Sequence, residues 1–512
     1  MKQFLSSIIL FPFFLLSAAG TFRPEILDLD PGTNAVADNR RLILTLPENS
    51  KTPVTFPSFR LNLKPYRAEM LTGELRFKAG LTGDLQNPKA GIRLRLSYPA
   101  DDNSHERLGG GFLQAKEVGS GLLPVSIALD PHAEFCHVEL RLEHCAGRVE
   151  FDLDSLRMER LFRKENREHI CEYSDAVKKR PVRRGVMSPI TDQTNEENFK
   201  VLRDWNVNLM RLQLNTSETI ARDPLRYQKF IDEKIENVIP EVLELGRKYG
   251  IAIIIDLHTV PGTANSRNDP CLFDDEERVR LFIRIWERIA AKFKGHPALY
   301  GYDLINEPNE QRPVRFGYWE VQRLAAEAIR KTDPETPIFI ESNHLCSPYT
   351  YPYLSPLKLK NIIYQFHSYD PFVYTHTRFT EKDRKAGKTI PPYPGKFLGA
   401  NWNFESMKAR LRHVREFQRK HQAKIYVGEF SARACAPGAE RYLEDSIRIF
   451  EESGWDWTYH AFRESKIWSL EYAGATDDTL TPSNDNPRKR VLLNAFRRNR
   501  SDAASGGATS LP

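Results

Sequence analysis

The chain has 512 residues, enough for two or three domains, and its 40% hydrophobic and 28% charged residues are typical of a globular protein with a core. The formal net charge is +6, from 74 basic and 68 acidic side chains. Spread over this length, the excess does not favour nucleic acid, and we expect no nucleic-acid partner.

The N-terminus has the pattern of an export signal. Lys2 gives a positive start, residues 4–16 form an almost unbroken apolar run, and residues 17–20 are small. The run is shorter than the roughly 20 residues that a membrane helix needs. We therefore predict a signal peptide at residues 1–20, a secreted or periplasmic mature protein, and no membrane association after cleavage.

Six cysteines stand at positions 136, 145, 171, 271, 346 and 435. No two of them have the close spacing of a zinc-binding pair, so they do not favour a metal site. Export permits disulfides. Cys136 and Cys145 lie in neighbouring strand-like runs and could pair, but the sequence leaves the connectivity open.

Residues 25–165 consist of short stretches in which apolar and polar side chains alternate, such as residues 60–63, 92–96 and 137–142. A period of two is typical of strands with one buried face, and that face must pack on a second layer. We predict an antiparallel β-sandwich. A carbohydrate-binding module and a spacer are both open interpretations of it.

Residues 180–500 alternate between continuous apolar runs and amphipathic helical patterns. Such runs are typical of strands buried on both faces in a parallel sheet. The eight expected strands cover residues 185–187, 208–214, 251–257, 299–305, 337–340, 361–366, 424–427 and 457–462. They predict an α/β fold, a (β/α)8 TIM barrel. A doubly wound open sheet would normally have a glycine-rich phosphate turn after its first strand, and the sequence has none.

The last twelve residues, 501–512, are rich in Ser, Ala and Gly. Such a segment cannot bury enough apolar surface to order itself, so we predict a disordered tail.

Two glutamates follow strands on the side where a barrel carries its active site. Glu307 follows the fourth strand and Glu429 the seventh. These strands lie across a barrel from each other, so the two carboxyl groups can face one bond. Glycosidic cleavage needs such a pair, with one group protonated to assist the leaving oxygen and one ionised to attack the sugar carbon.

Together with three other strand ends, these residues resemble glycoside hydrolase family 5, the cellulase family in the large clan of retaining barrel glycosidases. The matching segments are Arg211, Asp256-Leu257-His258, Asn306-Glu307-Pro308, His367-Ser368-Tyr369 and Gly428-Glu429-Phe430. The resemblance covers residues 180–500 and not the N-terminal part. It implies retaining hydrolysis of a β-glycosidic bond, without a cofactor.

The resemblance also implies a role for each matching residue. Glu307 would be the general acid/base and Glu429 the nucleophile. Tyr369 and Arg211 would hydrogen-bond the nucleophile and set its charge.

Three more residues are implied to bind the sugar. Asn306 would bind its 2-hydroxyl, and His258 and His367 would line the subsite beside the bond. The eighth strand departs from the family pattern, which usually ends it with a Trp that stacks under the sugar. His460 stands near that place, and Trp468 on the following loop could supply the aromatic floor instead.

The main prediction is endo-acting, endoglucanase-like hydrolysis of a β-1,4-linked polysaccharide, with a β-glycan as the partner. Hydrolysis of mannan or of small β-glucosides is an alternative within the same chemistry. A non-catalytic carbohydrate-binding protein is an alternative of another class, but it leaves both glutamates without a role. A zinc site made by His258, His367, His460 and Asp256 is a third alternative, and it leaves the glutamates equally idle.

Overall fold

The computed structural model describes most of the chain. It describes residues 16–499, except for residues 34, 39, 49–55, 65–68, 88, 100–105, 116–118, 130–132, 164–167, 190–193, 263–270, 311–313 and 398. The predicted disordered tail and residues 1–15 of the predicted signal peptide lie outside the described residues. Residues 16–20 belong to the first strand of the structure.

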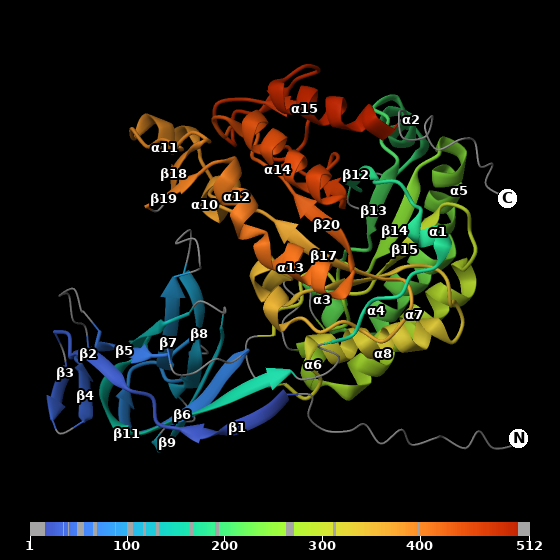
Figure 1. The fold of residues 1–512 in the computed structure, drawn as a ribbon. Coiled ribbons are helices and arrows are strands. Elements are labelled where there is room, and N and C mark those ends of the chain that lie inside the picture. The colour runs from blue at the N-terminus through green and yellow to red at the C-terminus, as the bar shows by residue number, and fades with distance from the viewer. Residues whose placement is uncertain are drawn as a thin grey trace, which may run out of the picture.

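The N-terminal part of the chain forms a sheet of antiparallel strands, beside the barrel in Figure 1. Its strands are β1 (Leu16–Phe22), β2 (Ile26–Asp30), β3 (Ala35–Asp38), β4 (Arg41–Leu46), β5 (Ser58–Asn62), β6 (Met70–Thr82), β7 (Gly91–Pro99), β8 (Glu106–Gln114), β9 (Ser120–Ala128), β10 (Phe135–Glu143) and β11 (Ala146–Arg163). The hydrogen-bonded order is β2-β5-β10-β7-β8-β9-β6-β11-β4-β3, and β1 pairs with β11. The strands therefore form one continuous ladder.

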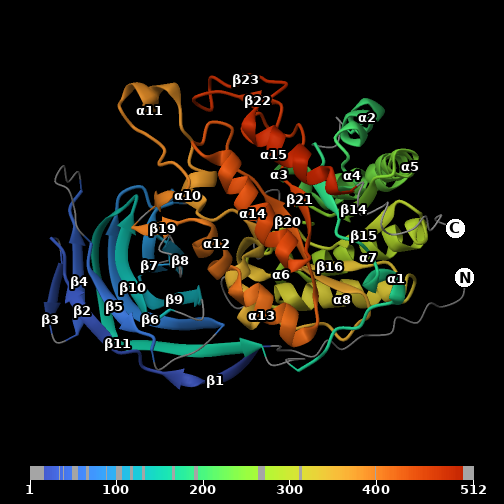
Figure 2. The same ribbon diagram turned by 45° about the horizontal axis from the view of Figure 1, so that its top comes forward.

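The ladder curves around one core, and Figure 2 shows it as a strongly bent layer. Buried and more exposed residues alternate along β10, as the period of two requires. Leu44 from β4, near one end of the ladder, and Leu61 from β5, near the other end, belong to the same buried cluster. The two halves of the sheet therefore enclose a shared core, which is the layered packing that the alternating sequence predicts.

Eight parallel strands close into a barrel in the C-terminal part of the chain, from residue 184 onward. They are β12 (Arg184–Met187), β13 (Leu209–Gln213), β14 (Ala252–Asp256), β15 (Leu299–Asp303), β16 (Ile338–Glu341), β17 (Ile362–Ser368), β20 (Lys424–Phe430) and β21 (Asp456–Tyr459). Every residue of β13, β15 and β16 is buried, as expected of strands covered on both sides. Each predicted strand overlaps one of these eight, and the predicted barrel fold is confirmed.

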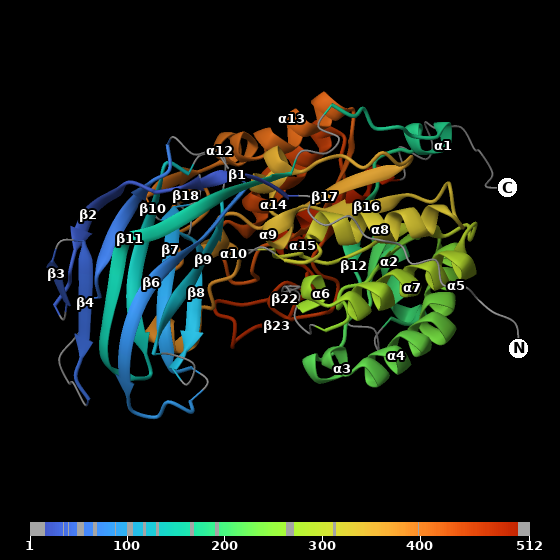
Figure 3. The same ribbon diagram turned by 90° about the horizontal axis from the view of Figure 1, so that it is seen from below.

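Helices cover the outside of the barrel, and α4, α5, α7 and α8 lie together on one side of it (Figure 3). The helices are α1 (Asp175–Lys178), α2 (Glu196–Asp204), α3 (Glu218–Arg222), α4 (Pro224–Glu233), α5 (Ile239–Tyr249), α6 (Cys271–Asp274), α7 (Glu276–Phe293), α8 (Tyr318–Arg330), α9 (Asn343–Cys346), α10 (Phe372–Thr375), α11 (Glu381–Lys385), α12 (Phe404–Arg410), α13 (Arg412–His421), α14 (Ala439–Ser453) and α15 (Pro487–Phe496). In α7, Val279, Phe282 and Trp286 form the buried face that the helical period predicts.

Two long segments follow barrel strands and carry short strands of their own. The segment after β17 contains β18 (Gly395–Phe397) and β19 (Ala400–Trp402), and the segment after β21 contains β22 (Tyr472–Ala473) and β23 (Thr481–Pro482). Within the described ranges, no helix has the length and apolar character needed to cross a bilayer. All six cysteines lie among the described residues, and none of them forms a disulfide bond, Cys136 and Cys145 included.

Candidate active site

One buried arginine connects the ends of several barrel strands. Arg211 on β13 is fully buried, and its Nη1 donates to Glu429 on β20 at 2.8 Å. Its Nε donates to Asp303 at 2.7 Å, and its Nη2 donates to Glu341 at 3.1 Å. Nη2 also lies 3.3 Å from a carboxylate oxygen of Asp256. One cation is thus shared by four carboxyl groups from four different strands.

One positive charge cannot compensate four buried carboxylates, and the pKa values of two of these carboxyl groups are raised. Burial outweighs the charge of Arg211 and raises the pKa of Asp303 to about 6, and burial also raises the pKa of Glu341 well above its ordinary value. For Arg211, burial lowers the pKa, but the surrounding carboxylates outweigh it and raise the pKa well above its usual value. The arginine therefore stays charged in the centre of the cluster.

The carboxyl group of Glu429 is held in its ionised form. Its Oε1 accepts from Arg211, and its Oε2 accepts from the Tyr369 hydroxyl at 2.7 Å. Burial raises its pKa, but the positive charges of His367, His460 and Arg211 outweigh burial and bring the pKa well below the ordinary value. An ionised, desolvated carboxylate is the form that can attack an electrophilic carbon.

Gly428, directly before this glutamate, is required by close packing. A Cβ at this position would lie 2.3 Å from the Gln365 Oε1 and 2.9 Å from the His367 Nε2. The Gln365 side chain in turn donates to Asp303 at 2.5 Å and to Glu341 at 2.8 Å. The glycine therefore lets β20 pass close to the polar side chains of β17.

Glu307 lies opposite, and its backbone is fixed by a neighbouring strand. Its φ is +51°, a left-handed conformation that is unfavourable for a residue with a side chain. Its backbone N–H donates to Glu341 Oε2 at 2.6 Å, and its carboxyl Oε1 lies 3.0 Å from His367 Nδ1. One carboxyl oxygen of Glu307, one of Glu429 and one ring nitrogen of His367 lie within 4.8 Å of one another.

Two further predicted residues lie against this centre. His258 Nδ1 is 2.8 Å from Asp256, and its Nε2 is 3.4 Å from the Asn306 side-chain nitrogen. The Asn306 side-chain oxygen accepts from Arg211 at 3.0 Å, and Asn306 is fully buried. The structure thus brings His258 and Asn306 to the same cluster as Arg211, as predicted from the sequence.

After β21, a polar pair stands where the sequence departs from the family pattern. His460 Nε2 lies 3.0 Å from Glu464 Oε2. Burial lowers the His460 pKa, but the charges of Glu464 and Glu429 raise it more, to about 9. The Trp468 ring centroid is 4.7 Å from that of His460, and the Tyr369 ring is 6.2 Å away. Trp468 therefore lies beside the site, and the ring of His460 is in contact range of both Trp468 and Tyr369.

The sequence did not single out several residues of this cluster as site residues. They are Gln213, Asp303, Glu341, Gln365 and Glu464. Glu341 carried a readable signal, because it directly follows three apolar residues at positions 338–340.

The histidine-based zinc alternative does not match the geometry. Among the described residues, two groups of side chains could share one ion, Glu341 with Cys346 and His367, and Glu307 with His367 and Glu429. Neither group contains His258, His460 or Asp256, the other residues of that alternative.

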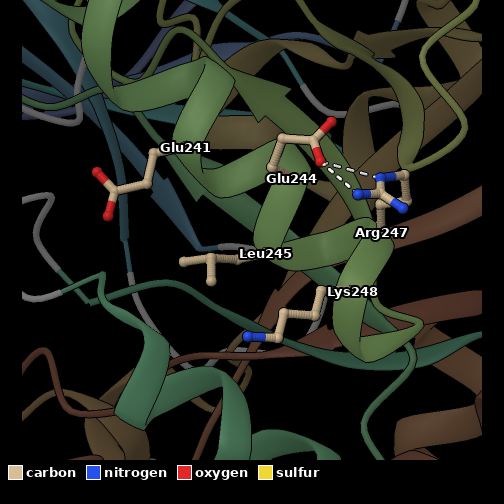
Figure 4. A pocket seen from close by; sticks show the side chains of 5 residues that line it. All are labelled: Glu241, Glu244, Leu245, Arg247 and Lys248. Atoms are coloured by element: carbon tan, nitrogen blue, oxygen red, sulfur yellow. Dashed lines mark hydrogen bonds and ion pairs between the residues drawn. The ribbon is translucent and has the colours of Figure 1, made fainter.

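A surface hollow on α5 is unrelated to the cluster. It is lined by Glu241, Glu244, Leu245, Arg247 and Lys248, of which Glu244 and Arg247 form an ion pair (Figure 4). All five residues belong to one outer helix of the barrel, so this hollow contains no strand-end residue.

Comparison with known proteins gives the family. The family model "Cellulase (glycosyl hydrolase family 5)" matches residues 175–466. Endoglucanase C of Acetivibrio thermocellus is 27% identical over 248 residues, which cover 43% of this chain and 71% of that protein. Cellodextrinase A of Ruminococcus flavefaciens is 29% identical over 184 residues, which cover 35% of this chain and 53% of that protein. A hyperthermophilic endo-β-1,4-glucanase, solved with substrate, matches 61% of this chain and 97% of its own at 19% identity and a TM-score of 0.47. The chain belongs to glycosyl hydrolase family 5, the cellulase family, and is a glycosidase that hydrolyses O-glycosyl bonds.

Proposed function

We propose that the protein is a secreted or periplasmic, retaining, endoglucanase-like hydrolase of a β-1,4-linked glycan. The observation that carries the mechanism is the closeness of Glu307 and Glu429, whose nearest carboxyl oxygens are within 4.8 Å. Retaining glycosidases have carboxyl groups about 5–5.5 Å apart, whereas inverting ones leave roughly 6.5–9.5 Å for a water molecule. The short separation supports direct attack by one carboxylate.

In the first step, the Glu429 carboxylate attacks the anomeric carbon of the sugar. The bond to the leaving oxygen breaks, and Glu307 gives that oxygen its proton. The sugar is then esterified to Glu429. In the second step, the Glu307 carboxylate takes a proton from water, the water oxygen attacks the same carbon, and Glu429 is released.

The surrounding residues prepare this pair. Arg211 and Tyr369 each donate to one oxygen of Glu429, which keeps the nucleophile ionised and fixes its orientation. His367 Nδ1 lies 3.0 Å from Glu307 and 3.7 Å from Glu429, between the two carboxyl groups.

The substrate and the location are supported by separate observations. The named relatives are an endoglucanase and a cellodextrinase, which favours β-1,4-glucan over mannan. The export proposal rests on the charged start, apolar run and small residues of the first 20 positions.

The test combines two variants with product analysis. Glu307→Gln and Glu429→Gln should each lose most turnover on the best substrate from a panel of β-glycans. Glu320→Gln is the matched control, because Glu320 is a buried, ion-paired glutamate on α8. NMR of the fresh product should show the β-anomer first, and early α-anomer would refute retention. Near-normal activity of either variant would refute the assignment of the pair.

A further inference from the structure

A third carboxylate lies at the site, on the loop after β21. Glu464 Oε2 is 3.0 Å from both His460 Nε2 and Gln213 Nε2. His258 is among the charges that lower the pKa of Glu464, and burial raises the pKa of Tyr369, to which the charge of Glu464 adds. Glu464 is therefore surrounded by residues that follow or end β13, β14, β17 and β21.

The two oxygens of this carboxylate differ. Both hydrogen bonds go to Oε2, and within the part of the chain that the structure describes, Oε1 has no partner. Oε1 is also not among the buried side-chain atoms that lack a partner, so it is open to solvent. The Glu464 side chain is 18% exposed, compared with 14% for Glu307 and 7% for Glu429. A carboxylate oxygen has room for about two donors, and this one receives none from the residues that the structure describes.

Glu464 is kept ionised by its neighbours. Burial raises its pKa, but the charge of His460 and the hydrogen bonds from His460 and Gln213 lower it more, so the pKa lies below its ordinary value. An ionised carboxylate accepts hydrogen bonds and cannot donate them. Sugar hydroxyls are donors, and a hydroxyl bound to a carboxylate makes a strong, charge-assisted hydrogen bond.

We propose that Glu464 is a sugar-binding residue, whose free Oε1 accepts hydrogen bonds from ring hydroxyls of the sugar that is transferred to Glu429. The ligand is thus a neutral sugar residue with free hydroxyl groups, held by a carboxylate that His460 and Gln213 orient. Hydrogen bonds to Glu464 would then hold the sugar in part, in addition to stacking on an aromatic side chain. This inference rests on the proposed function.

The experiment measures kcat/KM for an aryl β-glycoside and for its monodeoxy analogues, each of which lacks one ring hydroxyl of the transferred sugar. Wild type should lose roughly 10- to 100-fold on one analogue, the range expected when a charge-assisted hydrogen bond is removed. Glu464→Ala should lose a similar factor on the parent glycoside, with little further loss on that analogue. Glu471→Gln is the matched control, because Glu471 lies on the same segment in an ion pair with Arg463.

A second variant separates the loss of the carboxylate from a change in the structure of the loop. Glu464→Gln keeps the size of the side chain but removes its charge, and it should weaken discrimination against the same analogue while near-wild-type circular dichroism is kept. If both variants lose the same factor in kcat/KM on the parent glycoside as on every analogue, they keep the wild-type discrimination between these substrates. Glu464 then does not bind the sugar. If wild type and the control hydrolyse no β-glycoside at all, the proposed function fails, and this inference fails with it.

Discussion

Changing Glu341 to Gln should impair the general acid while leaving the nucleophile nearly intact. The Glu341 carboxylate receives three donors: the Glu307 backbone N–H at Oε2, and the side chains of Arg211 and Gln365 at Oε1. A glutamine has one acceptor oxygen and one donor nitrogen at these places. Two donors, Arg211 and Gln365, meet Oε1, and one donor meets Oε2. The glutamine should therefore place its amide oxygen at the Oε1 position, and its amide nitrogen should then face the Glu307 N–H.

The size of the effect follows from the contact that is lost. A donor that loses its partner in the folded protein costs about 1–3 kcal/mol, and the Glu307 backbone is held at φ +51° in part by this bond. A loss of about 2 kcal/mol in transition-state stabilisation corresponds to roughly 30-fold in rate. Glu307 would then be displaced from the leaving oxygen whenever its backbone relaxes.

The assay is kcat/KM for a series of aryl β-glycosides with leaving groups of different acidity. A dinitrophenolate leaves without protonation, so the variant should be close to wild type on that substrate. On an unsubstituted phenyl glycoside, which needs the acid, the loss should approach the full factor. Glu320→Gln serves as the control for a buried glutamate elsewhere. An equal loss on every leaving group would refute the reasoning and assign Glu341 to the support of Arg211 and the nucleophile alone.

Two further predictions concern stability. The pKa of His460 is raised from 6.5 to about 9 in the folded protein, so its contribution to stability is fully present below pH 6.5 and is lost as the pH rises through about 9. His460→Gln should therefore remove up to about 3 kcal/mol of pH dependence between urea unfolding curves at pH 6 and at pH 10; identical pH dependence in both proteins would contradict the raised pKa. Arg211→Met leaves Asp256, Asp303 and Glu341 buried without their cation. It should lower the free energy of unfolding by about 3–5 kcal/mol in the same assay at neutral pH, and an unchanged midpoint would show that the cluster is balanced in another way.

The barrel could be predicted from the sequence because its signal is local. Most barrel strands are short, mainly apolar runs, as β14 is, and the helices between them show their buried face at intervals of three and four residues. The order of strands in the N-terminal sheet could not be predicted in this way. There, β2 pairs with β5 and β5 with β10, and no local pattern specifies such distant partners.

The site was only partly predictable for the same reason. Glu307 and Glu429 stand out because each follows an apolar strand. Glu341 also follows an apolar run, residues 338–340, but it lies in none of the segments that carry the family resemblance. Glu464 lies on a loop, and its contact with Gln213 spans 251 positions of the chain. Only the closed barrel brings those two side chains together.

The sharing of Arg211 among four carboxyl groups restricts how this enzyme can change. A substitution at any of those strand ends alters the charge balance of all the others, so such changes should be rare and mostly harmful. The segments after β17 and β21 carry none of the carboxyl groups that contact this arginine. New substrate preferences, whether natural or engineered, should therefore accumulate in those two segments while the chemistry beneath them stays the same.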